Sequence, residues 1–417
     1  MQSEFRKKAI ELLDNNENYV RTGCTLLDCM AGGGVGLGFP FGKILNFVGD
    51  KSSGKTFISN EIIAANYHKF KKDLKFNYDD AETGYTFDTS KMYGVNIMHE
   101  DTLFSNTVEE LDVNLYNFLK KIRTEKQKGI YVVDSLDGLA NADTLAREEE
   151  RAKEMKKCQD KGEEYSGDKG TYGMQSQKFL SQEFFRTKAA KLDNRNILLI
   201  FISQIRDKID ARAFQKKWTR AGGKALDFYA HSVVVLANVS KIKKDNKIIG
   251  LVVKAKTDKS KTPRPYRECE FSLYFDYGID DIGSSLDYLF DLRGEDGKLK
   301  KASEEIRFDG NEEMTLKNLK EFFEKKEMLD VVREFAVEKT GSKKLTTDLL
   351  KEFAELNVKD DKDFKELFGT GETFTRDELI EKAEKDPKFK REIEIMTIAK
   401  WEEAESKVAT NRKGKYA

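Results

Sequence analysis

The octapeptide GDKSSGKT at residues 49–56 is the stretch whose residue types and spacing carry the clearest chemistry. It fits the pattern G-x-x-x-x-G-K-[ST] at every position, in which glycines let successive backbone N–H groups turn toward phosphate oxygens. The lysine of such a loop reaches the β- and γ-phosphates, and the hydroxyl that follows it can ligate Mg²⁺. The motif therefore predicts a site for a nucleotide and Mg²⁺. Its residues are Gly49, Asp50, Lys51, Ser52, Ser53, Gly54, Lys55 and Thr56.

The flanking sequence supplies the elements that would position this loop. KILNFV before the motif has the composition of a buried strand, and FISNEIIAANYHKF after it has that of a helix, whose N-terminal dipole favours phosphate. A second apolar run, GIYVVDS, ends in an acid, Asp134, that can hold Mg²⁺. The alternative is an aspartate that caps a turn at the edge of a sheet.

Hydrolysis of a nucleotide also requires a residue that orients a water molecule. Asp79, Asp80 and Glu82 in YDDAETG follow another apolar run and are the candidates. Acidic turns are common on protein surfaces, so the residue types leave this role open.

A loop of unusual composition follows the apolar run NILLIFISQ. Residues 206–228, RDKIDARAFQKKWTRAGGKALDF, place five cations and two large aromatic side chains between Asp207 and Ala221. Cations pair with phosphates and aromatic rings stack on bases, which suits nucleic-acid binding. A solvated loop anchored by one ring would have the same composition. The candidate DNA-binding residues are Lys208, Arg212, Phe214, Lys216, Lys217, Trp218 and Arg220.

Length and composition are those of a folded protein without a global charge. The chain has 417 residues, of which 39% are hydrophobic and 35% charged, and its 74 Lys and Arg balance 74 Asp and Glu. An anionic partner must therefore be met by a local patch. The N-terminus lacks an apolar signal region, and no run approaches the ~20 apolar residues that a membrane span needs. We expect a soluble, cytoplasmic protein with no membrane partner.

The order of the apolar runs predicts an α/β fold with a central, mostly parallel, twisted sheet flanked by helices. The expected strands are KILNFVG, LKFNYDD, GIYVVDS, NILLIFIS and HSVVVLANV, and IIGLVVKAK and CEFSLYFDYG could extend the sheet as hairpin strands. Residues 147–170 are almost all charged and are expected to form a frayed helix or mobile loop inserted after GIYVVDS. From about residue 281 the pattern becomes helical and charged, with a capping box predicted at Thr375.

In this order the motifs resemble the RecA family of recombinases, including its phage (UvsX-like) type, over roughly residues 20–280. RTGCTLLDCMAGGGVGLGFPFGKILNFVGDKSSGKT is similar to the family's approach to its P-loop, and FISQIRDKI to the run that adjoins its second DNA-binding loop. The resemblance implies a RecA-like P-loop ATPase core at 31–280. We expect an N-terminal helix and protomer-docking segment at 1–30 and a C-terminal helical domain at 281–417, the latter without a matching motif.

The resemblance also implies roles for single residues. DAE at 80–82 matches the family's acidic turn, so Glu82 would activate the attacking water, while Gln204 would sense the γ-phosphate. AGGKALDFYAHSVV is similar to the segment that closes the second DNA-binding loop, which places the basic aromatic loop where family members touch DNA.

Two lysines on a predicted strand, Lys254 and Lys256, have the spacing of a family pair that reaches the ATP of the neighbouring subunit. Alternation on a strand puts both on one face, although a solvated strand edge commonly carries lysines as well. With Lys55, Glu82 and Gln204 they complete the expected catalytic set. This role would place ATP, with Mg²⁺ on Thr56 and Asp134, between protomers.

The sequence departs from the family pattern around the expected base-binding positions. Thr86 and Thr89 occupy the positions that contact adenine in the family, the second where a stacking tyrosine is expected. Tyr85 or Phe87 could substitute. The charged insert also makes the first DNA-loop region longer and more acidic than usual.

The resemblance implies an ATP-dependent recombinase that forms filaments on single-stranded DNA, promotes homologous pairing and strand exchange with duplex DNA, and hydrolyses ATP to ADP and phosphate when DNA is bound. Single-strand-binding or mediator proteins are expected as further partners. One alternative is a RecA-fold helicase motor, and another is a non-catalytic accessory paralogue that binds ATP and DNA and loads another recombinase. A small-molecule P-loop kinase is more distant, because it would leave the basic aromatic loop unexplained.

Overall fold

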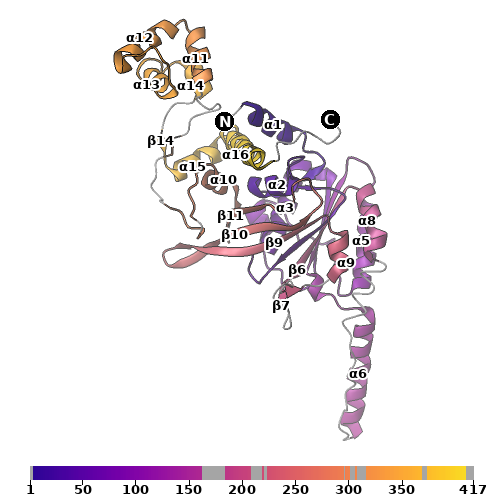
Figure 1. The fold of residues 1–417 in the computed structure, drawn as a ribbon. Coiled ribbons are helices and arrows are strands. Elements are labelled where there is room, and N and C mark those ends of the chain that lie inside the picture. Colours follow the sequence, from indigo (N-terminus) through magenta and orange to yellow (C-terminus); the bar gives the residue numbers. More distant parts are fainter. Residues whose placement is uncertain are drawn as a thin grey trace. The chain divides into compact units, whose positions relative to one another are not determined.

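The computed structural model consists of two compact units, residues 15–284 and residues 1–14 with 285–417 (Figure 1). The structure describes residues 3–161, 184–207, 218–219, 223–294, 296–300, 306–307, 316–368 and 373–409. The first unit contains the P-loop, the acidic turn, the basic aromatic loop and the two lysines of the expected trans pair.

An eight-stranded sheet in the order β12-β11-β10-β9-β3-β6-β5-β4 forms the centre of the first unit (Figure 1). Strands β9, β3, β6, β5 and β4 run parallel, while β10, β11 and β12 continue the sheet as antiparallel strands. The strands are β3 Ile44–Gly49, β4 Leu74–Asp80, β5 Lys128–Asp134, β6 Ile197–Gln204, β9 Ser232–Lys244, β10 Lys247–Ser260, β11 Glu268–Tyr274 and β12 Gly278–Asp280. The short pairs are β1 Tyr19–Val20 with β2 Phe39–Pro40 and β7 Arg206–Asp207 with β8 Trp218–Thr219. The mostly parallel sheet predicted from the apolar runs is therefore confirmed.

Helices cover this sheet and bury it on both faces. The helices of the unit are α2 Thr25–Gly32, α3 Lys55–Phe70, α4 Thr89–Tyr93, α5 Val108–Lys121, α6 Ala142–Lys161, α8 Phe185–Asn194 and α9 Gly223–Tyr229, with short turns at Lys71–Asp73 and Leu136–Gly138. Alternate residues of β5 and β6, including Tyr131 and Leu199, pack with α5, α8 and α9 in one core. Helix α3 packs against β3 to β6. Every residue of β6 before Gln204 is buried, so Gln204 is the residue of this strand whose side chain can contact a ligand.

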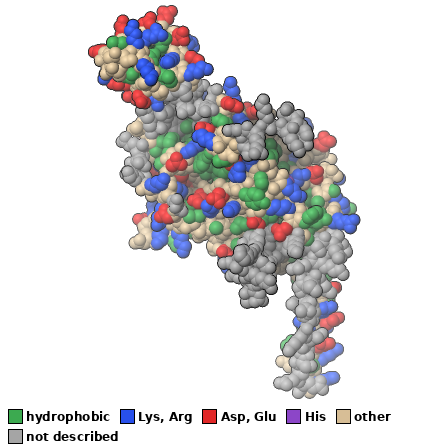
Figure 2. Space-filling model, in the orientation of Figure 1, with side chains coloured by type: hydrophobic (Ala, Val, Ile, Leu, Met, Phe, Trp, Pro, Cys, Tyr) green, Lys and Arg blue, Asp and Glu red, His purple; other side chains and the backbone are tan. Residues whose placement is uncertain are grey.

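The charged insert begins as a helix. Helix α6 carries the sequence ADTLAREEERAKEMKKCQDK, in which most side chains are charged and six of each sign alternate in blocks. Figure 2 shows blue and red side chains intermixed along it. Residues 147–161 of the segment predicted as a frayed helix or mobile loop therefore form a regular helix. Residues 162–170 of that segment lie outside the described residues.

The second unit is helical. Its helices are α1 Ser3–Asp14, α10 Asp281–Leu289, which starts in the first unit, α11 Leu316–Lys325, α12 Leu329–Thr340, α13 Thr347–Asn357, α14 Lys362–Phe368, α15 Arg376–Lys385 and α16 Pro387–Val408, with one strand pair, β13 Ile306–Arg307 and β14 Thr373–Phe374. Helices α11 to α14 share an apolar core that includes Phe323 and Phe353. The capping box predicted at Thr375 is present, with the side chains of Thr375 and Glu378 each accepting from the other's backbone N–H.

Helix α1 packs against α16 inside this unit. Arg6 makes a two-pronged ion pair with Glu392, at 2.5 and 2.7 Å, and Lys8 donates to the buried carboxylate of Glu402 at 2.6 Å. The two ends of the described chain are therefore joined by ion pairs. Over the same ranges of the chain, no helix has the length and apolarity required to cross a membrane.

Candidate nucleotide-binding and catalytic site

The loop between β3 and α3 is shaped by two glycines. A Cβ at Gly49 would come within 2.4 Å of the Ser53 hydroxyl and 2.6 Å of the Leu236 carbonyl, so no side chain fits there. Gly54, at the N-terminus of α3, has a φ of +88°, a conformation that glycine adopts without strain. No side chain caps this helix end. The first amides of α3 therefore have no side-chain cap, which is the condition that binding of an anion at this helix end requires.

Lys55 lies inside this loop. Its ammonium group donates to the carbonyls of Gly49 at 2.9 Å and Asp50 at 2.6 Å, and its side chain is almost buried. Burial lowers the pKa of Lys55, and the nearby carboxylates of Asp134 and Glu82 oppose that shift. A cation held under the loop by its own backbone is placed to contact phosphates that the loop binds.

Thr56 and Asp134 meet below the loop although 78 positions separate them. The Thr56 hydroxyl donates to Asp134 Oδ2 at 2.9 Å, because β3 and β5 are parallel and end at the same edge of the sheet. Burial raises the pKa of Asp134, so the carboxylate lies in a place where a cation would stabilise its charged form.

A hydroxyl and a carboxylate are the hard oxygen ligands that suit Mg²⁺. Within the described ranges, no group of three or more His, Cys, Asp or Glu could hold a metal by itself. A cation at Thr56 and Asp134 would therefore share its coordination with nucleotide phosphates and water, which is how Mg²⁺ is usually held at such loops.

Glu82 and Gln204 also come together. Gln204 Nε2 donates to Glu82 Oε1 at 2.9 Å, and the Ser135 hydroxyl donates a short hydrogen bond to the same oxygen. The backbone N–H of Gln204 donates to Asp137 at 3.0 Å. The ends of β4, β5 and β6 thus present one exposed carboxylate with a primary amide beside it.

The other two acids of the YDDAETG turn have different surroundings. Asp79 is fully buried and accepts from the Ser105 backbone and hydroxyl and from the Tyr131 hydroxyl at 2.8 Å. Burial raises its pKa. Asp80 accepts from the backbone N–H of Tyr85 at 2.9 Å. Of the three candidates, only Glu82 is exposed to the solvent from which a water would come.

A cavity of about 530 Å³ adjoins the loop. Besides the P-loop it is lined by Phe57, Phe87, Asn238, Lys241, Ile248, Leu251 and Phe275. The ring centroids of Phe57 and Phe87 lie 4.7 Å apart, edge to face, and Phe275 lies 6.4 Å from Phe57. This gives the phosphate loop a neighbouring apolar wall with aromatic faces, which suits a nucleobase.

The residues expected to contact the base have different surroundings in the structure. Thr89 is buried, and its hydroxyl accepts from the Ile97 backbone, so it serves the fold of the turn. Tyr85 donates to Asn60. Thr86 is exposed, and Phe87 lines the cavity. Sequence reasoning named Phe87 as a possible substitute but missed Phe57, which directly follows the motif, and Phe275, which is distant in sequence.

Lys254 and Lys256 lie on β10 and do not line this cavity. One carboxylate, Glu268 on the adjacent strand, contacts both: it lies 2.7 Å from the Lys254 ammonium and 3.9 Å from that of Lys256. The hydrogen bond to Glu268 raises the pKa of Lys254. The two lysines therefore share one face of the strand, as their spacing predicted, and are substantially exposed.

Most of the basic aromatic loop lies outside the described residues, namely Lys208, Arg212, Phe214, Lys216, Lys217 and Arg220. The backbone of Trp218 pairs with Asp207 in the β7–β8 ladder. That ladder starts at Arg206, two residues after Gln204. The loop is thus connected directly to the strand end that contacts Glu82.

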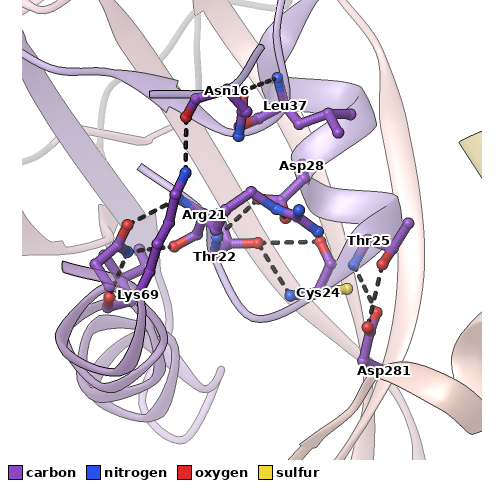
Figure 3. A network of polar contacts seen from close by, with 11 residues as sticks. Asn16, Arg21, Thr22, Cys24, Thr25, Asp28, Leu37, Lys69 and Asp281 are labelled. Atoms are coloured by element: carbon purple, nitrogen blue, oxygen red, sulfur yellow. Dashed lines mark hydrogen bonds and ion pairs between the residues drawn. The ribbon is translucent and has the colours of Figure 1, made fainter. Parts of the chain in front are cut away.

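A buried polar network fixes the segment that leads to the P-loop strand (Figure 3). Asp28, on α2, is fully buried and accepts from Arg21 at 2.5 Å and from the Thr22 backbone at 2.7 Å. Burial raises the pKa of Asp28, and the guanidinium of Arg21 opposes that shift. Thr25 donates to Asp281, just after β12, at 2.6 Å. The network ties residues far apart in the chain to one side of the sheet.

A phosphate-binding loop between a parallel strand and a helix, with an acid ending a nearby strand, defines a P-loop nucleoside triphosphatase. A family model described as the RecA N-terminal domain matches residues 1–280. Similar proteins include the RecA protein of Wolinella succinogenes, 29% identical over 282 residues, which are 68% of this chain and 71% of the relative. The RecA protein of Helicobacter pylori is 30% identical over 281 residues, 67% of this chain and 71% of the relative. The RecA protein of Ehrlichia ruminantium is 28% identical over 284 residues, which are 68% of this chain and 70% of the relative.

The chain belongs to the RecA family. This confirms the RecA-like fold, and it supports the recombinase over the helicase motor and the accessory paralogue. Members of the family are DNA-dependent ATPases that bind DNA and assemble into filaments. The relatives named are bacterial RecA proteins, so they support the family and not specifically its phage type.

Proposed function

We propose that this protein is an ATP-dependent recombinase that coats single-stranded DNA, pairs it with homologous duplex DNA and exchanges strands. The observation that carries this proposal is the hydrogen bond between Gln204 and Glu82. It joins the candidate for orienting water to the strand from which the basic aromatic loop starts. DNA-stimulated hydrolysis requires such a connection.

Each residue of the site has a role in this proposal. The P-loop amides and Lys55 hold the triphosphate, and Thr56 and Asp134 hold Mg²⁺. When bound, Mg²⁺ would neutralise charge on the β- and γ-phosphates. Glu82 orients the attacking water and accepts its proton, and Gln204 positions the Glu82 carboxylate and contacts the γ-phosphate. Phe57, Phe87 and Phe275 provide the surface for the base, in place of the tyrosine expected at Thr89.

The DNA-binding role of the loop rests on its composition and its place in the chain. Lys208, Arg212, Lys216, Lys217 and Arg220 would pair with phosphates, while Phe214 and Trp218 would stack on bases. Cations that contact phosphates and rings that stack on bases do not distinguish one base from another, so binding is expected to be independent of DNA sequence.

Filament assembly is the second part of the proposal. Lys254 and Lys256 would reach the ATP of a neighbouring protomer, which their exposure and their absence from the lining of their own cavity support. Residues 1–30 would take part in protomer docking, and single-strand-binding or mediator proteins would act on the filament. We also propose a phage-type relationship within the family, which the divergence of the chain from the bacterial RecA proteins supports.

Steady-state ATP hydrolysis without DNA, with single-stranded DNA and with duplex DNA, at two salt concentrations, tests this function. We expect stimulation by single strands that weakens as salt rises. Replacing Lys216, Lys217 and Trp218 together by alanine should remove most of that stimulation. A wild-type rate that ignores DNA would overturn the proposal in favour of the accessory paralogue, and unwinding of a forked duplex would favour the helicase.

A further inference from the structure

The hydroxyl of Tyr78 lies at the candidate metal site, although no motif includes it. Tyr78 is on β4 and is fully buried. Its hydroxyl donates to Asp134 Oδ2 at 2.6 Å, the oxygen that also accepts from Thr56 at 2.9 Å. Two donors on one oxygen fix the plane of the carboxylate. Of the residues that the structure describes, none donates a hydrogen bond to the other oxygen, Oδ1.

The ring of Tyr78 is held independently of this hydrogen bond. It packs edge to face against Tyr85 at 4.9 Å, and Tyr85 donates to Asn60 at 3.0 Å. A buried phenylalanine would fill the same space, so packing alone does not require the hydroxyl. The hydroxyl is therefore the feature that needs an explanation, and the group it contacts is the carboxylate proposed to hold Mg²⁺.

We propose that Tyr78 is a positioning residue for the metal aspartate. Thr56 is itself a proposed metal ligand, so its hydroxyl oxygen would divide its contacts between the cation and Asp134. Tyr78 is not a proposed ligand, and its hydroxyl can hold the carboxylate whether or not the metal is bound. Outer donors of this kind typically change metal affinity by roughly 10- to 100-fold. The inference rests on the nucleotide and Mg²⁺ site of the proposed function.

The structure offers a matched control. Tyr131, on the adjacent strand β5, is also fully buried and also donates its hydroxyl to a carboxylate, that of Asp79, at 2.8 Å. Asp79 is held by Ser105 and is not one of the proposed ligands. Removing this hydroxyl imposes a comparable change in the core without touching Asp134.

The test uses Mn²⁺ as the probe and does not depend on turnover. Free Mn²⁺ is measured by electron paramagnetic resonance in titrations of the full-length protein with ADP. ADP binding is measured separately in excess chelator. We expect Tyr78→Phe to weaken Mn²⁺ binding to the ADP complex about 10-fold, with metal-free ADP binding unchanged. Tyr131→Phe should bind Mn²⁺ like the wild type.

Wild-type Mn²⁺ affinity in Tyr78→Phe would overturn the inference, as would an equal loss in both variants. These results are distinct from failure of the proposed function, in which the wild type itself would show no ADP-dependent Mn²⁺ binding. Should Tyr78→Phe fail to fold, fluorotyrosine at position 78 keeps the hydroxyl and gives a fluorine NMR signal. That signal should shift when Mg²⁺ is added to the ADP complex, whereas the same label at position 131 should not respond. No shift at position 78 would also overturn the inference.

Discussion

Glu268 holds both candidate trans-acting lysines in the single protomer, so replacing it should change how readily they reach a neighbouring nucleotide. Its carboxylate lies 2.7 Å from Lys254 and 3.9 Å from Lys256. A phosphate of the next protomer would have to displace or share this carboxylate. Glu268→Gln keeps the shape and removes the charge, so we expect hydrolysis in the presence of single-stranded DNA to become half-maximal at a lower ATP concentration.

The size of this effect follows from the exposure of the pair. The side chains of Lys254 and Glu268 are 35% and 47% exposed. Solvent screening limits such pairs to about 0–1 kcal/mol, which corresponds to at most a roughly fivefold change in an equilibrium constant. The gain should shrink with added salt, because salt screens exposed charges.

The assay is DNA-stimulated ATP hydrolysis against ATP concentration at low and moderate salt. Glu352→Gln is the matched control, since Glu352 pairs with Lys339 at the same 2.7 Å and similar exposure, 45% and 48%, in the helical unit. It should leave hydrolysis unchanged. A higher ATP requirement in Glu268→Gln would refute competition and show instead that the carboxylate positions the lysines. The same ATP requirement in both variants and the wild type would show that Glu268 does not affect the reaction.

Four further outcomes are expected. Glu82→Gln should retain ATP binding and lose hydrolysis by about 10²- to 10⁴-fold in single-turnover assays; near-normal turnover would exclude Glu82 as the base. Phe87→Ala should weaken ADP binding by about 1–3 kcal/mol in a calorimetric titration, if its ring stacks on the base. Asp28→Ala leaves the guanidinium of Arg21 without its buried partner and should cost about 3 kcal/mol of unfolding free energy in urea; a loss below measurement error would contradict the network. Burial lowers the pKa of His231 to about 4, so the unfolded state binds more protons between that value and pH 6.5; stability should fall by about 1–3 kcal/mol as pH drops through this window, and His231→Gln should flatten that slope.

The phosphate and metal ends of the site could be predicted because their determinants are local. A P-loop between a strand and a helix fixes Lys55 and Thr56, and an acid at the end of a parallel strand must reach the same sheet edge as Thr56. The capping box at Thr375 is likewise a relation between residues three positions apart. The P-loop and the capping box are each contained in a short segment, and the pairing of Thr56 with Asp134 follows from the parallel order of the strands.

The base wall and the second partner of Asp134 could not be predicted in this way. Phe57 and Phe275 meet because the antiparallel extension of the sheet brings the end of β11 to α3, which no local pattern encodes. From the sequence, Tyr78 is expected to be a core residue of an apolar strand. Its hydroxyl reaches Asp134 only because β4 and β5 pair in this register. The residue types alone left Asp79 and Glu82 open; the resemblance pointed to Glu82, and the structure shows Ser105 and Tyr131 donating to Asp79.

The hydrogen bonds connect the basic loop more directly to Glu82 than to Asp134. Glu82 accepts from Gln204 at the end of β6 and from Ser135 after β5. The residue after Gln204, Ile205, donates its backbone N–H to the carbonyl of Gly49 at 3.4 Å. A contact of about 3.6 Å no longer counts as a hydrogen bond, so a displacement on the order of 1 Å, passed from the loop through Arg206, would break the Gln204 and Ile205 contacts and leave Glu82 with Ser135. Asp134 instead accepts from Tyr78 inside the buried sheet. If the loop binds DNA as proposed, DNA would therefore change the placement of Glu82 more than that of Asp134.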